Sequence, residues 1–285
     1  MKNFVIVANS AKGNSRQCAE QVADILERNG CRCTASLIAE EDARYHYRFT
    51  DPALVPEETE AVLSLGGDGT FIHSCKDLIS LQLPVFGINY GTLGYMTEVG
   101  MDGFEDALKS MVSGNYEIEE RILLNCDIVS DGKVVKRSLA FNDIVLQRAL
   151  DSGIAQYDVS VDGHYLNTYS ADGMILSTPT GSTGYNLSAG GPVVLPISKI
   201  MLVTPICAHT LNSRTIVLPS DVSIEIKGQP NSRGKYPEIY VTIDGEKGIR
   251  LEEGTSICAT GASETAKILK INKMSFIEQL GKKMR

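Results

Sequence analysis

The sequence has no apolar run long enough to cross a membrane, since a spanning helix needs about 18 consecutive apolar residues. It also has a deficit of basic residues, with 27 Lys and Arg against 35 Asp and Glu, a formal net charge of −8 and a pI near 5.1. The most basic stretch is the tail, with Lys282, Lys283 and Arg285. Nucleic acids and anionic membrane surfaces require clustered Lys and Arg, so the composition argues against both as partners.

Paired cysteines are missing too: the seven cysteines are scattered without a Cys-x-x-Cys pair. Cys31 and Cys33 alternate along a predicted strand, which favours small buried apolar side chains over a metal or redox pair. The four histidines form no ligand set, and no Asp-x-Asp or Walker-type pattern predicts a metal cage. The initial apolar run, residues 4–8, is too short for a signal peptide. We therefore expect a reduced, cytoplasmic protein.

The chain of 285 residues, 43% hydrophobic and 22% charged, is long enough for two globular domains. Its first part alternates short apolar runs with segments of helical periodicity, and the runs are residues 4–8, 31–37, 61–65 and 84–88. This β-α-β order predicts a parallel sheet with right-handed crossovers. The predicted fold class is α/β, with residues 1–115 as the first domain.

Beyond residue 115 the apolar periodicity changes from 3.6 to 2. Three Asp-Gly pairs, at Asp131, Asp162 and Asp244, separate short apolar runs and predict hairpin turns. We therefore predict a β-rich second domain over residues 116–260. Residues 261–285 either add a strand that packs back on the first domain or form a loose tail.

A glycine-rich turn follows the third apolar run, with the sequence Leu-Ser-Leu-Gly-Gly-Asp-Gly-Thr over residues 63–70. Glycine lets the backbone approach a ligand closely, and a helix predicted over residues 71–80 would aim its first N–H groups at the same spot, which favours phosphate. Asp68 could orient or deprotonate a hydroxyl that attacks phosphorus. The alternative is that Asp-Gly simply makes a good turn.

A second glycine-bearing loop, residues 89–98, follows the fourth apolar run. Because parallel strands end at the same edge of a sheet, both loops are expected at the edge where open sheets bind ligands. Residues 171–192 form another segment, too rich in Gly, Ser and Thr to be ordinary sheet. Its hydroxyl groups and the ring of Tyr185 suit the sugar and base of a nucleotide, whereas a serine-rich connecting loop is the alternative.

The order of these motifs resembles that of the NAD kinase family. The motifs that carry the resemblance are residues 66–70, 87–95, 141–146, 171–192, 204–211 and 241–246. The Gly-Gly-Asp-Gly-Thr string alone also occurs in diacylglycerol and sphingosine kinases, but the run from Ser177 to Pro192 is specific to NAD kinases. The fold implied is an N-terminal α/β domain that carries the catalytic turn and a β-rich C-terminal domain that binds NAD and forms oligomers.

The resemblance implies transfer of a phosphoryl group to the 2′-hydroxyl of the adenosine ribose of NAD, which gives NADP. It makes Asp68 the catalytic carboxylate and implies that a further set binds the donor phosphates or the dinucleotide: Gly67, Gly69, Thr70, Asn142, Asp143, Asp172, Thr183, Gly184, Tyr185, Asn186, Ser188 and Glu246. A divalent cation, Mg²⁺ or Mn²⁺, is expected to arrive with ATP. A homodimer or homotetramer is also implied, and His209 is given a structural role.

The chain departs from the family pattern at four of these motif positions: Asp143 replaces Glu, Gly184 replaces Ala, Ala171 replaces Gly and Ala208 replaces Pro. Asp143 keeps the acceptor but shortens its reach by one methylene, which changes the contact with the ribose. Two rival functions are a lipid kinase, disfavoured by the acidic composition, and a nucleotide sensor, for which Asp68 would be dispensable. ATP, another triphosphate or polyphosphate as donor, NADH as acceptor, and feedback by NADP or NADPH are left open.

Overall fold

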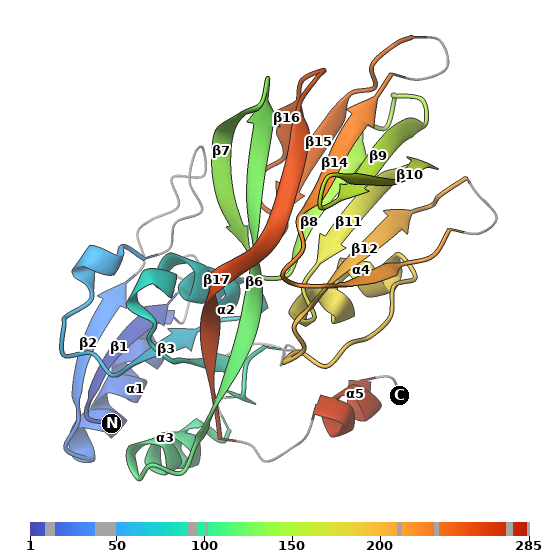
Figure 1. Cartoon of the computed structure of the whole chain (residues 1–285). Helices are drawn as coiled ribbons and strands as arrows, with labels where there is room; N and C mark the ends of the chain where they lie inside the picture. Colours follow the sequence, from blue (N-terminus) through green and yellow to red (C-terminus); the bar gives the residue numbers. More distant parts are fainter. Residues whose placement is uncertain are drawn as a thin grey trace. The chain divides into compact units, whose positions relative to one another are not determined.

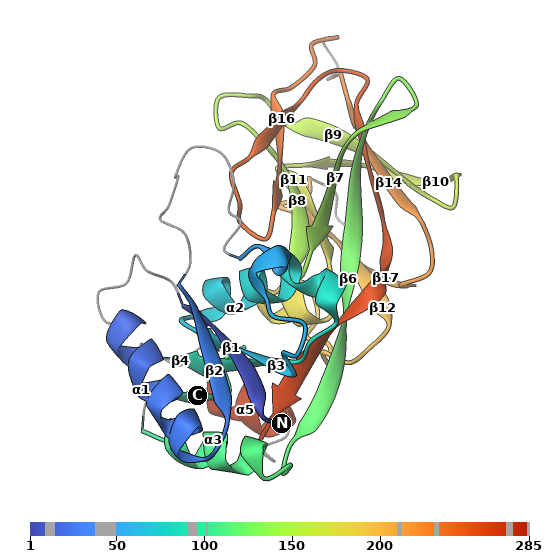
Figure 2. The ribbon, with the colours of Figure 1, turned by 90° about the vertical axis from the view of Figure 1, so that its left-hand side faces the viewer.

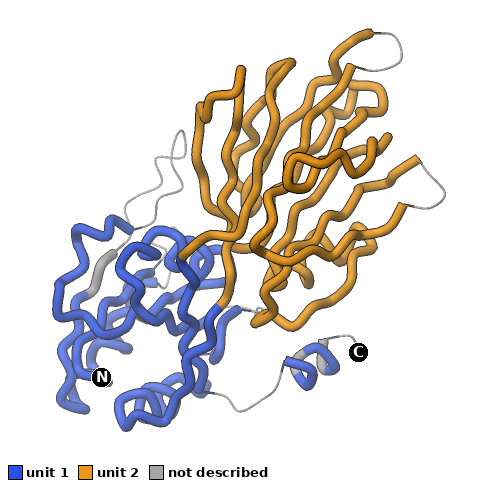
Figure 3. Tube along the Cα trace, in the orientation of Figure 1, with its two compact units in different colours: residues 1–120, 264–285 blue, residues 121–263 orange. Residues whose placement is uncertain are grey.

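The computed structural model (Figure 1) describes residues 1–8, 15–37, 50–89, 96–100, 102–209, 213–230, 234–271 and 276–283. Two compact units make up the chain (Figure 3): residues 1–120 with 264–285, and residues 121–263. Domain boundaries were predicted after residues 115 and 260, and the two compact units divide after residues 120 and 263. Residues 90–95 of the loop predicted over residues 89–98 and the motif residues 210 and 211 lie outside the described residues.

Unit 1 is built on a parallel sheet in the order β2-β1-β3-β4-β17, with β5 also parallel to β4. Its strands are β1 (Asn3–Ala8), β2 (Arg32–Leu37), β3 (Ala61–Leu65), β4 (Val85–Asn89), β5 (Val99–Gly100) and the end of β17 (Ser256–Lys270). All residues of β3 and β4 are buried, as expected for strands covered on both faces. The predicted parallel α/β sheet is confirmed.

Helices lie on both faces of this sheet (Figure 2). Those of unit 1 are α1 (Ser15–Arg28), α2 (Asp68–Asp77), α3 (Phe104–Val112) and α5 (Phe276–Lys283), with short 3₁₀ turns η1 (Pro52–Leu54) and η2 (Ile79–Leu81). α1 and α3 share one core with Phe4, Ile6 and Leu63 of the sheet. α2 packs against β3 and β4 on the other face, where Ser64 contacts Ser74.

The helix predicted over residues 71–80 is wrong at both ends, because α2 spans Asp68–Asp77. Gly67 is extended, with φ −91° and ψ −171°, and its carbonyl accepts the N–H of Phe71. The helical turn therefore begins inside the glycine motif, which a count of apolar residues does not detect. Asp68 consequently lies in the first turn of the helix, where the helix dipole stabilises a negative charge.

Unit 2 contains a six-stranded antiparallel sheet and the antiparallel part of an 11-stranded sheet, to which the parallel strands of unit 1 also belong. One has the order β13 (Ile216–Pro219), β12 (Ile200–Ile206), β11 (Gly173–Ser177), β8 (Asp143–Arg148), β15 (Ile239–Ile243), β16 (Ile249–Leu251). The other contains β10 (His164–Ala171), β9 (Ala155–Val161), β14 (Ile224–Gln229), the start of β17, β6 (Glu117–Ser130) and β7 (Lys133–Ala140). The inward side chains of both sheets form one core around Tyr157, which confirms the predicted β-rich domain.

The three Asp-Gly turns are confirmed, since Asp131, Asp162 and Asp244 have φ near 50° and each following glycine has φ above 70°. The expectation that residues 171–192 avoid ordinary sheet is wrong for its first part. Residues 173–177 form β11, a wholly buried strand between β8 and β12. Only residues 180–188 fold as the 3₁₀ turn η3 (Thr180–Thr183) and the short helix α4 (Tyr185–Ser188).

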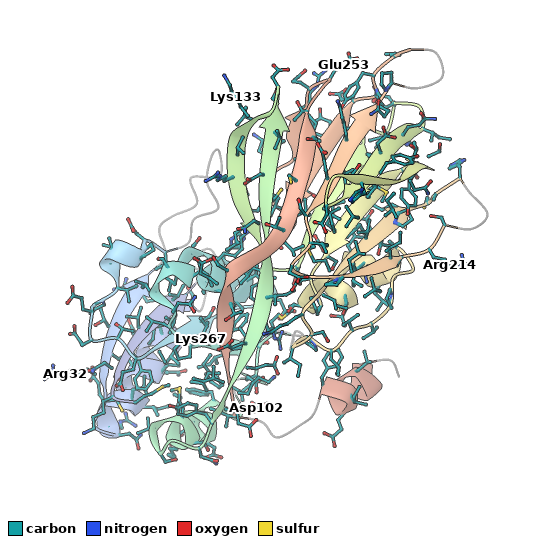
Figure 4. All side chains as sticks on the ribbon, in the orientation of Figure 1. Arg32, Asp102, Lys133, Arg214, Glu253 and Lys267 are labelled. Carbon is teal, nitrogen blue, oxygen red and sulfur yellow. The ribbon has the colours of Figure 1, made fainter. Side chains whose placement is uncertain are left out.

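β17 runs from unit 2 into unit 1, pairing with β14 at its start and with β4 at Ile268. Of the two alternatives for the end of the chain, the added strand is therefore right for residues 266–270. Charged side chains of both signs lie on the surface of each unit, for example Arg32 and Asp102 of unit 1 and Lys133 and Glu253 of unit 2 in Figure 4. No helix in the described part of the chain is long and apolar enough to cross a membrane.

Candidate functional site

The glycine turn of unit 1 is held in a tight conformation by contacts that require glycine. The N–H of Gly66 donates to the carbonyl of Ile88 at 3.0 Å, so the turn starts where β3 and β4 end together. A Cβ on Gly66 would lie 2.4 Å from Oγ1 of Thr70, which excludes any larger residue without rearrangement. Gly69 differs, because a Cβ there would meet nothing within 4 Å. Gly69 therefore leaves open space in front of the first turn of α2.

Asp68 is oriented by the segment that follows the second glycine-bearing loop. Its Oδ1 accepts the backbone N–H of Met96 at 3.0 Å. Asp68 and Gly67 are half-buried, Gly69 is exposed, and Thr70 is buried below them. We call Gly66–Thr70 with Met96 the Asp68 cluster. It presents one carboxylate and the first N–H groups of a helix, which is a combination suited to a phosphorylated ligand.

Buried hydroxyl groups support this turn from below. Ser74 donates to the carbonyl of Thr70 at 2.8 Å, and its Oγ lies 3.0 Å from that of Ser64 in β3. Both serines are almost fully buried, so the first turn of α2 is bonded to the sheet by satisfied polar groups. This network fixes the Asp68 cluster to rigid elements rather than to a mobile loop.

In unit 2, the short segment before β8 is bonded to the start of the Gly-, Ser- and Thr-rich segment. The carbonyl of Asn142 accepts the N–H of Thr178 at 2.9 Å, and Oγ1 of Thr178 donates to the carbonyl of Phe141 at 2.7 Å. A Cβ on Gly181 would lie 2.2 Å from the carbonyl oxygen of Asn142, so only glycine fits there. We call residues 141–143, 177–182 and Asp244 the Asn142 cluster.

Two oxygens of the Asn142 cluster are buried without a hydrogen-bond partner among the described residues: Oδ1 of Asn142 and Oγ1 of Thr180. Unsatisfied buried oxygens are unfavourable, so these two oxygens are candidates to accept hydrogen bonds from a ligand. The amide and the hydroxyl are suited to hydroxyl groups of a sugar.

Asp143 lies beside Asn142 and is 8% exposed. Burial, together with the nearby charge of Asp244, raises the pKa of Asp143 to about 7. The pKa of Tyr185 is also raised, by burial first and then by the charges of Cys207, Asp172 and Asp143. The charges of Asp143 and Asp172 thus both act on Tyr185.

Asp172 is held by an ion pair that the sequence analysis did not identify. Nε of Arg148 lies 2.8 Å from Oδ1 of Asp172, and the guanidinium also donates to the carbonyl of Ser152 at 2.7 Å. Arg148 is the last residue of β8, and Asp172 directly precedes β11, so their pairing follows from the register of the two strands. No local sequence signal indicates this partner.

The remaining predicted residues of unit 2 differ in exposure. Thr183 is half-buried, whereas Gly184, Tyr185 and Ser188 are exposed along η3 and α4. Asn186 is wholly buried: its amide donates to the carbonyls of Ser182 (3.2 Å) and Pro192 (3.1 Å) and accepts from Thr204 (2.6 Å). Asn186 therefore shapes the turn that presents its neighbours.

Glu246 and His209 lie in turns at the ends of strands. The N–H of Glu246 donates to the carbonyl of Ile243 at 2.9 Å, in the turn that starts with Asp244. His209 is exposed, and its N–H donates to the carbonyl of Ser170 at 2.8 Å. The described residues contain no group of three or more His, Cys, Asp and Glu side chains that could hold a metal ion.

A parallel sheet with a carboxylate in a glycine turn, joined to a β-sandwich with a Gly-, Ser- and Thr-rich turn, defines a two-domain kinase of the Gly-Gly-Asp-Gly-Thr type. Comparisons with known proteins identify the family. Residues 4–116 match the ATP-NAD kinase N-terminal domain, and residues 141–271 match the ATP-NAD kinase C-terminal domain. The chain belongs to the NAD kinase family.

Curated relatives agree with this assignment over the whole chain. An NAD kinase of Lachnospira eligens is 37% identical over 293 residues, covering 100% of both chains. An NAD kinase of Agathobacter rectalis is 37% identical over 284 residues, covering 100% of this chain and 99% of the relative.

Two solved structures show the same fold. Yeast NADH kinase complexed with NADH has a TM-score of 0.82 and 25% identity, covering 100% of this chain and 87% of that chain. An NAD kinase from Archaeoglobus fulgidus in complex with ATP has a TM-score of 0.74 and 26% identity, covering 99% and 98%.

Proposed function

We propose that the protein transfers the terminal phosphoryl group of ATP to the 2′-hydroxyl of the adenosine ribose of NAD, giving NADP and ADP. The observation that carries this proposal is the placement of Asp68 in the first turn of α2, oriented by the N–H of Met96, in a chain of the NAD kinase family. The complexes of relatives with ATP and with NADH support a nucleotide donor and a dinucleotide acceptor.

In this proposal Asp68 accepts the proton of the 2′-hydroxyl as the ribose oxygen forms its bond to phosphorus. The bond from phosphorus to the bridging oxygen of ATP breaks, and ADP leaves with that electron pair. Because such transfers pass through a loose transition state, the position of Asp68 matters more than strong basicity. Gly67, Gly69 and Thr70 hold the donor phosphates at the start of α2, so residues 1–115 form the donor and catalytic domain.

The acceptor is proposed to bind in the β-rich domain. Oδ1 of Asn142, which has no hydrogen-bond partner in the described part of the chain, receives the ribose hydroxyls together with Asp143. Asp172, Thr183, Gly184, Tyr185, Ser188 and Glu246 surround the rest of the dinucleotide, and Asn186 positions that turn. Asp143 is one methylene shorter than the Glu of the family, so we expect its reach to be decisive for the ribose contact.

The divalent cation, Mg²⁺ or Mn²⁺, is proposed to arrive on the ATP phosphates rather than in a protein cage. When bound, the cation neutralises charge on the phosphates. We further propose a homodimer or homotetramer, testable by light scattering, and a cytoplasmic location, which the seven free thiols support.

The test is formation of NADP from NAD and Mg²⁺–ATP by the purified protein, coupled to an NADP-specific dehydrogenase. Asp68→Asn is measured alongside, because an amide oxygen still accepts the N–H of Met96 while the proton acceptor is lost. We expect turnover in the wild type and a decrease of at least about 10³-fold in the variant, with NAD binding retained in calorimetry. Binding without NADP formation with any donor would instead identify a nucleotide sensor.

A second acceptor, NADH, deserves the same assay because a solved relative is an NADH kinase bound to NADH. Product is measured as NADPH by chromatography. Comparable kcat/KM for NAD and NADH would show that the site does not distinguish the charge of the nicotinamide ring. Polyphosphate replaces ATP in a third set of assays to define the donor.

A further inference from the structure

The sequence analysis placed Asp244 in a hairpin turn and in a family motif without giving it a role, but its carboxylate holds the segment that leads into β8. Oδ1 accepts the N–H groups of Phe141 at 3.1 Å, Asn142 at 2.7 Å and Asp143 at 3.2 Å, and Oδ2 accepts the N–H of Phe141 at 2.9 Å. Hydrogen bonds to a carboxylate are stronger than those between neutral groups. A single side chain therefore binds three consecutive peptide groups.

We propose that Asp244 is a positioning residue of the acceptor site, which fixes residues 141–143 for the ribose and couples its charge to that of Asp143. This inference rests on the proposed function, because it concerns how that function's acceptor is held. The inference goes beyond the proposed function because it assigns a role to Asp244, which is not among the residues predicted to bind the substrates.

The bonding between the two segments runs in both directions. The N–H of Asp244 donates to the carbonyl of Asp143 at 3.0 Å, so the turn after β15 and the start of β8 are joined by backbone and side chain together. Asp244 adopts φ 49°, a conformation that Asp and Asn tolerate better than other residues with a Cβ. Asp or Asn is therefore favoured at this position by the backbone as well as by the hydrogen bonds.

The opposite side of residues 141–143 is bonded to Thr178, as described above. Backbone groups of the segment are thus used on both sides, by Asp244 and by Thr178. The side-chain oxygen of Asn142 remains buried without a partner among the described residues. Such an arrangement holds the main chain rigidly and leaves that oxygen for a ligand, as a preorganised binding site requires.

The two carboxylates also interact through their charges. Burial is the largest cause of the raised pKa of Asp143, and the charge of Asp244 adds to it. Among the described residues, the charge of Asp143 also acts on Tyr185 of α4. Ionised Asp143 accepts hydrogen bonds from ribose hydroxyls, so affinity for NAD should increase as pH rises through about 7. Removing the charge of Asp244 should move this increase in NAD affinity to lower pH.

The first experiment measures KM for NAD between pH 5.5 and 9 in the wild type and in Asp244→Asn. Asn keeps an oxygen that can accept the three N–H groups and suits the positive φ, but it removes the charge. We expect the inflection of the profile to shift to lower pH by about half a unit to one unit, as loss of a neighbouring like charge predicts.

The second variant, Asp244→Ala, removes the hydrogen bonds as well. We expect KM for NAD to increase at least about tenfold, since the loss of a charge-assisted bond is worth that factor or more, while KM for ATP changes less than about twofold. The matched control is Asp162→Ala. Asp162 has the same backbone conformation, φ 48°, in an Asp-Gly turn of the same unit, and its carboxylate accepts one N–H, that of Ser223 at 2.8 Å.

An Asp162→Ala variant with the same loss as Asp244→Ala would show a general effect of turn strain and overturn the proposal. An unchanged pH profile in Asp244→Asn would do so as well. Titration of the Asp143 carboxyl carbon by NMR, without substrate, measures the coupling independently of catalysis. If the wild type makes no NADP, the proposed function fails, whereas a titration that does not move in Asp244→Asn contradicts the role of Asp244 itself.

Discussion

Two glycines of the same turn have opposite surroundings, although both belong to one motif. A Cβ on Gly66 would lie 2.4 Å from Oγ1 and 2.7 Å from Cβ of Thr70, whereas a Cβ on Gly69 would meet nothing within 4 Å. The first glycine is thus required by the fold. The second is exposed at the start of α2, where we place the donor phosphates.

We therefore predict that Gly66→Ala lowers the free energy of unfolding by about 1 to 3 kcal/mol, because overpacking displaces Thr70. Gly69→Ala should leave stability within about 0.5 kcal/mol of the wild type. It should nevertheless raise KM for ATP about tenfold, since a methyl group occupies space needed by phosphates. Urea unfolding and steady-state kinetics separate the two effects. An unchanged KM in Gly69→Ala would contradict the placement of the donor.

Asp143 provides a prediction about pH and stability. Its pKa in the folded protein is raised from 3.8 to about 7, so the folded state binds more protons than the unfolded state between these values. The free energy of unfolding contributed by this group therefore falls as pH rises from about 4 to 7. Ionisation of Asp143 therefore lowers the free energy of unfolding, so a carboxylate at this position reduces stability at neutral pH.

In Asp143→Asn this cost is removed without a change in shape. We expect the variant to be more stable than the wild type by roughly 2 to 4 kcal/mol at pH 8, because each pKa unit corresponds to about 1.4 kcal/mol. At pH 4 the two proteins should be nearly equal. Urea unfolding at both pH values measures the difference, and a pH-independent difference would show that charge is not the cause.

At the scale of elements, a buried ion pair joins the end of β17 to the segment after β4. The side chain of Glu98 is 2% exposed and that of Lys270 is 16% exposed, and Nζ of Lys270 bonds Oε1 of Glu98. The N–H of Glu98 also donates to the carbonyl of Gly87 at 3.0 Å. Because Met96 lies two residues before Glu98, this contact supports the segment that orients Asp68.

Lys270→Met should lower the free energy of unfolding by about 3 kcal/mol or more, since it removes a cation from beside a buried carboxylate. The double variant with Glu98→Gln should recover part of the loss. Lys267→Met, on the same strand and half-exposed, serves as the control and should change stability by less than about 0.5 kcal/mol. Equal losses in Lys267→Met and Lys270→Met, measured by urea unfolding, would exclude the ion pair as the cause.

At the scale of the whole molecule, the chain leaves unit 1 after residue 120 and returns to it at residue 264. The returning strand contributes Ala266, Ile268 and Leu269, all at most 2% exposed. Its backbone also accepts a bond from the side chain of Gln82, at the carbonyl of Thr265 (3.3 Å). The core of unit 1 therefore includes side chains of residues 264–270, which follow unit 2 in the sequence.

A chain that stops after Ser263 should lose the folded state of unit 1, because burial of Ile268 and Leu269 alone contributes about 1.5 to 3 kcal/mol each. A chain that stops after Ile271 keeps the strand and should retain it. Hydrogen exchange of the amides of β4 in both chains, followed by mass spectrometry, measures the difference. Equal protection of β4 in both chains would show that unit 1 folds without residues 264–271.

The sequence by itself determined the class of fold and the candidate residues. An apolar run predicted β3 over its observed bounds, and the Asp-Gly pairs predicted the positive φ angles of three turns. These features depend on neighbours in the chain, and so a local pattern is sufficient to predict them. The motifs likewise identified the family, because each concentrates unusual residues within a short segment.

Only the tertiary structure decided which of these residues meet. The bonds of Asp244 to residues 141–143, the pairing of Arg148 with Asp172 and the ion pair of Glu98 with Lys270 join segments far apart in the sequence. Strand order and register create these contacts, and neither is encoded in the periodicity of a single strand. The burial of β11 has the same origin, since its small and polar ends are covered by strands from both sides.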